Sequence, residues 1–533
     1  MLLIFSFIIA LFASFVALPL LMRLAWRLQL VDAPGERKVH ASAVPRCGGL
    51  AIVGAALVPV FMWAPMDDAL AGYIASALVV VAFGVIDDFR GMNAWSKFFG
   101  QGIAVAVALS AGIVFEVLPF FGMDPAPPWA TYPVTALFLL GVTNAFNLFD
   151  GLDGLAGGCA ALSLLAVGVL AAQGDGFGYA LIAAAVIGGI FGFLRFNTHP
   201  ANVFMGDAGS QFLGFTVAVL SVLVIGRADP ALNPALPLLL LGVPVVDTLM
   251  VMTVRLAEGR SPFSGDRNHV HHKLLDVGCA HYEAVAVVYV IQASMIAAAF
   301  VLRYASDLAV VGAFAAFAVA VLAPLVWLRR VRRRGPPPPP GAPTAERRNL
   351  WLRRQTWLAP TSVAAVRYGI VGFMICGAFA PLPYDQGFGL AVAGVGVLIV
   401  AAGLVRPLSS ATVTRVAAYG AAVLVGYLLV RWSLVSAPVA WAVALYLTAL
   451  CAALGVALRV SRRDLFRVTP QDLLVLMFAI AVPNLAGDVL SGQPIVKVAL
   501  VLIILFYASE FAIVRDDRAR WTIAPAAFLS LGS

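Results

Sequence analysis

Repeated long apolar runs constrain this chain more than any other feature. Of its 533 residues, 62% are hydrophobic and only 12% are charged, whereas soluble domains carry about 25% charged residues. Many runs reach the roughly 20 residues that an α-helix needs to cross a bilayer core. We therefore predict an all-α polytopic integral membrane protein with about 11 helices in a front part and about six in a C-terminal extension. The predicted helices start near residues 2, 47, 69, 98, 130, 156, 178, 209, 235, 283 and 308, and then near 364, 386, 412, 438, 472 and 494.

Lys and Arg are distributed unevenly between the loops that join these helices. The first run (residues 2–22) has no basic stretch before it and no small-residue cleavage site, so we interpret it as a retained membrane helix and not a signal peptide. With the N-terminus outside, only four of the 35 basic residues fall on the outer side: Arg227, Arg303, Arg431 and Lys497. Cytoplasmic loops carry such an excess of positive charge. The sequence thus predicts a multi-pass protein of the cell inner (plasma) membrane.

The net charge of +8 is scattered over the loops between spans, so it is poorly suited to nucleic acid and well suited to anionic headgroups of membrane lipids and anionic cytoplasmic substrates. The five cysteines show no paired spacing and lie in or near apolar segments. They indicate neither a disulfide framework nor a zinc site.

One segment divides the chain. The stretch "RRVRRRGPPPPPGAPTAERRNLWLRR" (residues 329–354) is basic and rich in proline, and it cannot continue a helix. We predict a membrane domain over 1–328, a cytoplasmic linker over 329–363 and a C-terminal transmembrane region over 364–533. The last region has isolated acids but no cluster of carboxylates and histidines. Our interpretation for it is a structural or oligomerisation module, which leaves a homodimer open.

Polar residues of the front part gather at the helix ends that this topology places in the cytoplasm. An acidic residue at mid-helix costs about 2.5–3.5 kcal/mol on insertion scales, so such residues need water or compensation. Each motif alone has a plain interpretation as a helix cap, an ion pair or a turn. Four motifs facing one compartment indicate a single site. They are "DDFRGMNAWSK" (Asp87, Asp88, Lys97), "NAFNLFDGLDGLAGG" (Asn147, Asp150, Asp153), "NVFMGDAGS" (Asp207) and "EGRSPFSGDRNHVHHKLL" (Arg260, Arg267, His269, His271, His272).

The residue types of these motifs favour a metal and a phosphate. Five aspartates would repel one another if they met without a counter-charge. Mg²⁺ takes oxygen ligands and is usually held by one or two protein oxygens together with substrate phosphates. Glycines at 151, 154, 157 and 158 let the backbone approach a ligand closely. A nucleotide diphosphate with Mg²⁺, or with Mn²⁺ as the alternative, satisfies these requirements.

These motifs, together with "VDAPGERKVHASAVPRCGGLAI" in the first cytoplasmic loop, resemble the MraY/WecA-type polyprenyl-phosphate N-acetylhexosamine-1-phosphate transferases, glycosyltransferase family 4. The resemblance covers roughly residues 1–328, and its HxHH form is similar to the branch that uses UDP-GlcNAc-like donors. It implies transfer of N-acetylhexosamine 1-phosphate, with GlcNAc the first choice, from a UDP-sugar to undecaprenyl phosphate. UMP would leave, and the product would start a lipid-linked cell-surface glycan. Residues 364–533 lie beyond the part of the chain that resembles the family, and the family pattern does not require them.

The resemblance also implies roles position by position. Asn147 and Asp207 match the family's magnesium ligands. Asp87 and Asp88 match the acidic pair near the acceptor phosphate, and Lys97 matches a basic residue near the phosphates. The other matches are Asp150 and Asp153 on the uridine and metal side, Arg260, Arg267, His269, His271 and His272 around the donor's diphosphate and sugar, and Lys38 and His40 in the first-loop "RKxH" pattern.

The implied mechanism is a direct displacement at the donor's β-phosphorus. The acceptor phosphate is already largely ionised at neutral pH, so we favour Asp87 or Asp88 as positioning groups with only partial base character. A covalent aspartyl-phosphate route is the alternative mechanism. Two other function classes stay open. A polytopic transporter of lipid-linked glycans would place its polar groups near the bilayer midplane, and a membrane diphosphatase would need no polyprenyl acceptor.

Overall fold

The computed structural model describes residues 2–32, 43–261, 268–334, 358–378, 437–460 and 469–485, with a few isolated residues between 425 and 512. The chain forms two compact units. The first comprises Met1–Ala342 with Thr469–Leu474, and the second comprises Pro343–Val468 with Val475–Ser533. The first unit contains all four polar motifs.

The first unit is a helical bundle with one short β-pair. Strand β1 (Val31–Asp32) pairs antiparallel with β2 (Val44–Pro45). The helices are α1 (Leu2–Arg27), α2 (Gly48–Trp63), α3 (Asp68–Arg90), α4 (Ala94–Ser110), α5 (Pro128–Phe149), α6 (Leu155–Gln173), α7 (Phe177–Asn197), α8 (Gly206–Leu223) with its π-helical end η1 (Val224–Ala228), α9 (Pro237–Leu240), α10 (Gly242–Ala257), α11 (Val270–Asp276), α12 (His281–Leu302) and α13 (Asp307–Arg334).

The remaining described helices are α15 (Leu358–Ala378), α18 (Ala437–Val460) and α19 (Pro470–Leu485). Within the second unit, α15 and α18 pack against each other.

The predicted fold class is confirmed. Eight of the described helices are long and apolar enough to cross a membrane: α1, α3, α5, α6, α7, α8 with η1, α12 and α13 up to Trp327. The predicted spans near 47 and 98 form the shorter helices α2 and α4, of 16 and 17 residues. The span predicted near 235 is interrupted at Leu241, which separates α9 from α10. The spans predicted near 386, 412 and 494 lie largely outside the described residues.

Helix α8 forms the centre of the first unit. Its side chains are buried from Ala208 to its end, which is the expected position for a helix that is apolar all round. It packs against α3 and α5 and also contacts α2 and α6. Gly214 permits the approach to α5, because a β-carbon there would lie 2.9 Å from the Val142 carbonyl oxygen. The start of α8 is therefore surrounded by the ends of neighbouring helices.

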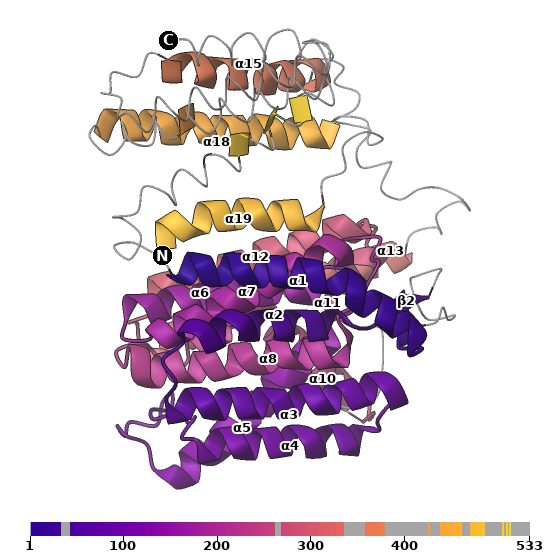
Figure 1. The fold of residues 1–533 in the computed structure, drawn as a ribbon, viewed down its shortest axis with the longest axis vertical. Helices are drawn as coiled ribbons and strands as arrows, with labels where there is room; N and C mark the ends of the chain where they lie inside the picture. The colour runs from indigo at the N-terminus through magenta and orange to yellow at the C-terminus, as the bar shows by residue number, and fades with distance from the viewer. Residues whose placement is uncertain are drawn as a thin grey trace. The chain divides into compact units, whose positions relative to one another are not determined.

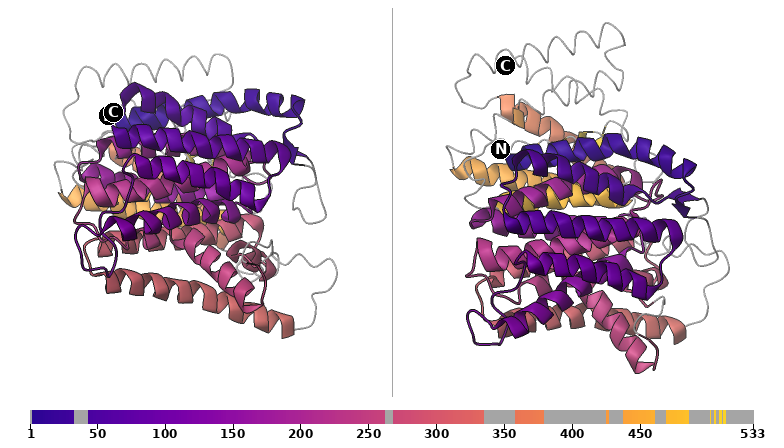
Figure 2. Two further views of the ribbon diagram at one scale, coloured as in Figure 1. Left: turned by 90° about the horizontal axis from the view of Figure 1, so that it is seen from below. Right: turned by 60° about the horizontal axis from the view of Figure 1, so that its bottom comes forward.

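The helices of the first unit lie side by side, so their connections gather at the two ends of the bundle (Figures 1 and 2). At one end, Asp307 accepts hydrogen bonds from Asn233 and from the Phe120 backbone, and Tyr304 donates to Asp229. At the other end lie β2, α11, the end of α3 and the start of α8. This second end carries the described residues of the predicted site, and we call it the site end.

Candidate active site

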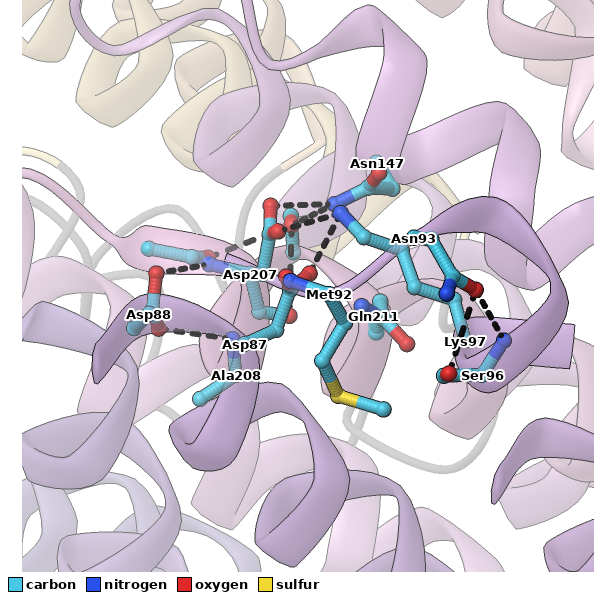
Figure 3. A network of polar contacts seen from close by, with 12 residues as sticks. Asp87, Asp88, Met92, Asn93, Ser96, Lys97, Asn147, Asp207, Ala208 and Gln211 are labelled. Atoms are coloured by element: carbon cyan, nitrogen blue, oxygen red, sulfur yellow. Dashed lines mark hydrogen bonds and ion pairs between the residues drawn. The ribbon is translucent and has the colours of Figure 1, made fainter. Parts of the chain in front are cut away.

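Asp207, in the first turn of α8, is the residue on which three helices converge. Lys97 of α4 donates from Nζ to Asp207 Oδ2 at 2.8 Å, and Asn147 of α5 donates from Nδ2 to Asp207 Oδ1 at 2.8 Å (Figure 3). Asn147 also donates to Ser210 Oγ at 2.9 Å. The three residues come from separate motifs in the sequence, and the fold brings them together around one carboxylate.

Asp88 caps the helix that carries Asp207. Its Oδ1 accepts from the Asp207 backbone N–H at 2.9 Å, and its Oδ2 accepts from the Ala208 N–H at 3.1 Å (Figure 3). Free N–H groups and a partial positive charge at a helix start favour such a carboxylate. Gly206 has φ +76°, and a β-carbon there would lie 2.5 Å from Asp88 Oδ2. Gly206 of "MGDAGS" therefore cannot be replaced without strain. The two hydrogen bonds to Asp88 fix the position of Asp207.

Asp87 is buried, with 5% of its surface exposed, at the last turn of α3. Its Oδ1 accepts from the Met92 backbone N–H at 2.5 Å, and it forms an ion pair with Lys97. Lys97 thus contacts Asp87 and Asp207 together. One ammonium group offsets two carboxylates, which leaves negative charge at this end of the bundle for a further cation to balance.

Asp150 and Asp153 lie in the turn between α5 and α6. Asp150 has an accessible surface and no hydrogen-bond or ion-pair partner among the described residues. Partial loss of hydration, with repulsion from Asp207 and Asp153, raises the pKa of Asp150 to about 7. A carboxyl group with this pKa is only partly ionised at neutral pH, and a nearby cation would favour its ionised form.

Asp153 belongs to a cluster with two histidines that the sequence analysis did not select. His199 Nδ1 lies 2.7 Å from Asp153 Oδ2, and His281 Nε2 lies 3.9 Å from the same oxygen. The donor atoms of the three residues lie within 4.8 Å of one another. However, the two imidazole rings stack at 4.1 Å with planes only 16° apart, so their nitrogen lone pairs do not converge on one point. We interpret the cluster as a hydrogen-bonded stack that anchors the turn.

The histidine segment "HVHH" lies against this same turn. His271 is 1% exposed, and its Nε2 packs so closely on Gly151 that a β-carbon there would overlap it. The His271 ring also packs edge-on against the Phe149 ring, with their centroids 6.3 Å apart. Burial, with repulsion from His272 and His269, lowers the pKa of His271 to about 2, so this imidazole is neutral. The "DGLDG" and "HVHH" motifs, far apart in the chain, thus form one surface.

The remaining predicted site residues are less closely associated with Asp207. Arg260 is exposed and pairs with Glu258. His272 is half-buried beside His271, with ring centroids 4.3 Å apart. Lys38, His40 and Arg267 lie outside the described residues, so their roles stay predictions.

Two residues of the site end were not predicted from the sequence, although the sequence contained an indication of each. Asp247 is a single acid inside the apolar run of α10, where its cost demands a partner, and it accepts a hydrogen bond from the Val270 backbone N–H of the histidine segment. Ser210 follows Asp207 by one helical turn and accepts from Asn147. His199 and His281 had no comparable signal, because isolated histidines near helix ends are common.

Comparisons with known proteins agree with this arrangement. The model of "Glycosyl transferase family 4" matches residues 70–225, which contain the first three polar motifs. A "Probable undecaprenyl-phosphate N-acetylglucosaminyl 1-phosphate transferase" of Bacillus subtilis is 33% identical over 305 residues, covering 56% of this chain and 85% of the relative.

Two further relatives carry similar names. A "Decaprenyl-phosphate N-acetylglucosaminephosphotransferase" of Mycobacterium leprae is 33% identical over 298 residues, covering 50% of this chain and 75% of the relative. An "Undecaprenyl-phosphate alpha-N-acetylglucosaminyl 1-phosphate transferase" of Yersinia pestis is 32% identical over 279 residues, covering 50% of this chain and 75% of the relative. On this evidence the chain belongs to glycosyl transferase family 4.

Proposed function

We propose that this protein transfers GlcNAc 1-phosphate from UDP-GlcNAc to a polyprenyl phosphate, undecaprenyl phosphate being the expected acceptor, and releases UMP. The observation that carries the proposal is the convergence of Lys97, Asn147 and the Asp88-capped start of α8 on Asp207. The names of the relatives support GlcNAc as the sugar.

The reaction is a phosphoryl transfer. An oxygen of the acceptor phosphate forms a bond to the donor's β-phosphorus, and the bond from that phosphorus to the bridging oxygen breaks, so UMP leaves with the electron pair. Positioning and charge stabilisation are the main tasks in such reactions. Lys97 lies where its ammonium group can offset charge on the phosphates. Both oxygens of Asp88 already accept backbone hydrogen bonds, which supports direct displacement over a covalent route through this residue.

We propose Mg²⁺ as the cofactor, with Mn²⁺ as the alternative. The donors fit a hard cation, because Asp207 is a carboxylate and Asn147 uses its amide nitrogen toward Asp207 and Ser210, which leaves its Oδ1 available. When bound there, the ion supplies positive charge that neutralises the diphosphate and makes UMP a better leaving group. Asp150, without a partner among the described residues, is the third carboxylate within electrostatic range of Asp207.

The placement of Lys and Arg supports a site on the cytoplasmic side of the plasma membrane. For the C-terminal transmembrane region (364–533) we retain the proposal of a structural or oligomerisation module. The domain limits 1–328, 329–363 and 364–533 also stay proposals.

The test is UMP release by the full-length protein in membranes, with labelled UDP-GlcNAc and with or without undecaprenyl phosphate. We expect release that needs both the acceptor and a divalent cation and is abolished in Asp207→Asn. Asp229→Asn, which changes an acid at the opposite end of the bundle, is the matched control and should retain activity. Release without acceptor would indicate a diphosphatase, and no release with intact folding would favour a transporter. Unchanged turnover of Asp207→Asn would contradict the site assignment.

A further inference from the structure

Asp247 is a buried acid that takes no part in the site described around Asp207. It lies in α10 with no exposed surface. Its Oδ2 is 2.7 Å from His269 Nδ1, and its Oδ1 accepts from the Val270 backbone N–H at 2.6 Å. A buried carboxylate without partners would be strongly destabilising. Here both oxygens are used, and both partners belong to the "HVHH" segment.

These two contacts determine the protonation pattern of His269. A carboxylate has only acceptor oxygens, so a hydrogen bond to His269 Nδ1 requires the proton on that nitrogen. A neutral imidazole then carries its lone pair on Nε2. The contact to Val270 N–H fixes the backbone at the start of α11 at the same time. Asp247 therefore holds both the ring and the chain that carries it.

His269 is linked by packing contacts to the "DGLDG" turn, which carries Asp150 and Asp153. The His269 and His271 rings stack with centroids 5.5 Å apart and planes 12° apart. His271 in turn packs on Gly151, next to Asp150. A rotation of the His269 ring would disturb His271 and, through it, the "DGLDG" turn.

We propose that Asp247 is a positioning residue that sets the tautomer and orientation of His269 and thereby the donor side of the reaction centre. The proposal rests on the proposed function for its effect on activity. Its effect on His269 is independent of that function, so the two can fail separately.

The test compares wild type with Asp247→Asn. An amide has one acceptor oxygen, so keeping the bond to Val270 N–H turns its NH₂ toward His269 Nδ1 and moves the imidazole proton to Nε2. Partners that orient metal-binding histidines typically contribute about 10- to 100-fold in metal affinity or activity, and we expect an effect of the same order on catalysis here. We expect kcat/KM for UDP-GlcNAc to fall by about this factor through a higher KM for UDP-GlcNAc, while KM for undecaprenyl phosphate stays within about twofold. A merely structural defect would lower the active fraction, and with it kcat, and would leave both KM values unchanged.

The second readout is ¹⁵N NMR of histidine-labelled protein at about pH 9, where ordinary histidines are neutral. The His269 signal is assigned by its loss in His269→Gln. We expect Nδ1 protonated in wild type and Nε2 protonated in Asp247→Asn. The wild-type spectrum is informative even if the variant fails to fold. Nε2 protonation of His269 in wild type would overturn the proposal.

Asp307→Asn is the matched control. Asp307 also accepts two hydrogen bonds, from Phe120 N–H and Asn233, but at the opposite end of the bundle. It should leave both kinetic constants and the His269 signal unchanged. Equal kinetic losses in Asp247→Asn and Asp307→Asn would show a general folding effect and overturn the positioning role. If wild type transfers no sugar phosphate but shows the predicted tautomers, the proposed function fails and the Asp247–His269 contact stands.

Discussion

The most specific consequence of the structure concerns Asp88, whose two oxygens hold the start of α8. In Asp88→Asn one oxygen can still accept from Asp207 N–H, but the amide NH₂ then faces the Ala208 N–H, which is also a donor. A hydrogen bond to a charged group contributes about 1.5–3 kcal/mol. If that free energy no longer favours the productive position of Asp207, kcat should fall about 10- to 150-fold, since 1.4 kcal/mol corresponds to a factor of ten.

The assay is initial-rate UMP release at saturating undecaprenyl phosphate over a range of UDP-GlcNAc concentrations. We expect the loss in kcat, with KM for UDP-GlcNAc within about threefold of wild type, since the donor-side histidines are untouched. Asp67→Asn is the control. Asp67 caps the other end of the same helix through Leu70 N–H at 2.7 Å, so its loss tests general destabilisation of α3. An unchanged kcat, or a defect confined to KM, would refute the capping argument.

Three further results are expected. Gly151→Ala should raise KM for UDP-GlcNAc at least tenfold, because its methyl group displaces His271; Gly141→Ala in α5, where a β-carbon meets nothing within 4 Å, should be neutral in the same assay. Because the pKa of Asp150 is raised to about 7 in the folded protein, the metal-free protein should lose stability as the pH rises from about 4, the unfolded value, to about 7, and change little above that. Thermal unfolding in EDTA should show this decline between about pH 4 and 7, and a smaller one in Asp150→Asn. Removal of divalent cations should abolish UMP release, and added Mg²⁺ should restore it.

Much of the architecture was accessible from the sequence because hydrophobic runs determine where helices cross a membrane. The predicted starts near 69, 130, 156 and 283 lie within two residues of the observed helices. The clustering of Asp87, Asp88, Lys97, Asn147 and Asp207 could be anticipated because connections of an alternating bundle gather at two ends.

The hydrogen-bond partners could not be anticipated. That Asp88 caps α8, and does not face the acceptor with a free oxygen, depends on the close approach of α3 and α8. The interruption at Leu241 was also missed, since the sequence continues apolar on both sides of it. The β-pair of Val31–Asp32 with Val44–Pro45 is too short to give a periodic signal.

The composition of the histidine cluster shows the same limit. His199 follows the end of α7 and His281 is the first residue of α12, and only the fold places them beside Asp153. Asp247 was detectable in principle, since an acid in an apolar helix needs a partner. Its partner, His269, required the structure.

The central claim is that the β-phosphate of the donor moves with its sugar onto the lipid. The direct measurement uses purified full-length protein, undecaprenyl phosphate, Mg²⁺ and UDP-GlcNAc labelled with ³²P in the β-phosphate and with ³H in the sugar. We expect both labels together in the lipid fraction, in equal amounts, with one unlabelled UMP released for each. Sugar in the lipid without ³²P, or ³²P appearing only in water-soluble GlcNAc 1-phosphate, would rule out transfer of the sugar phosphate.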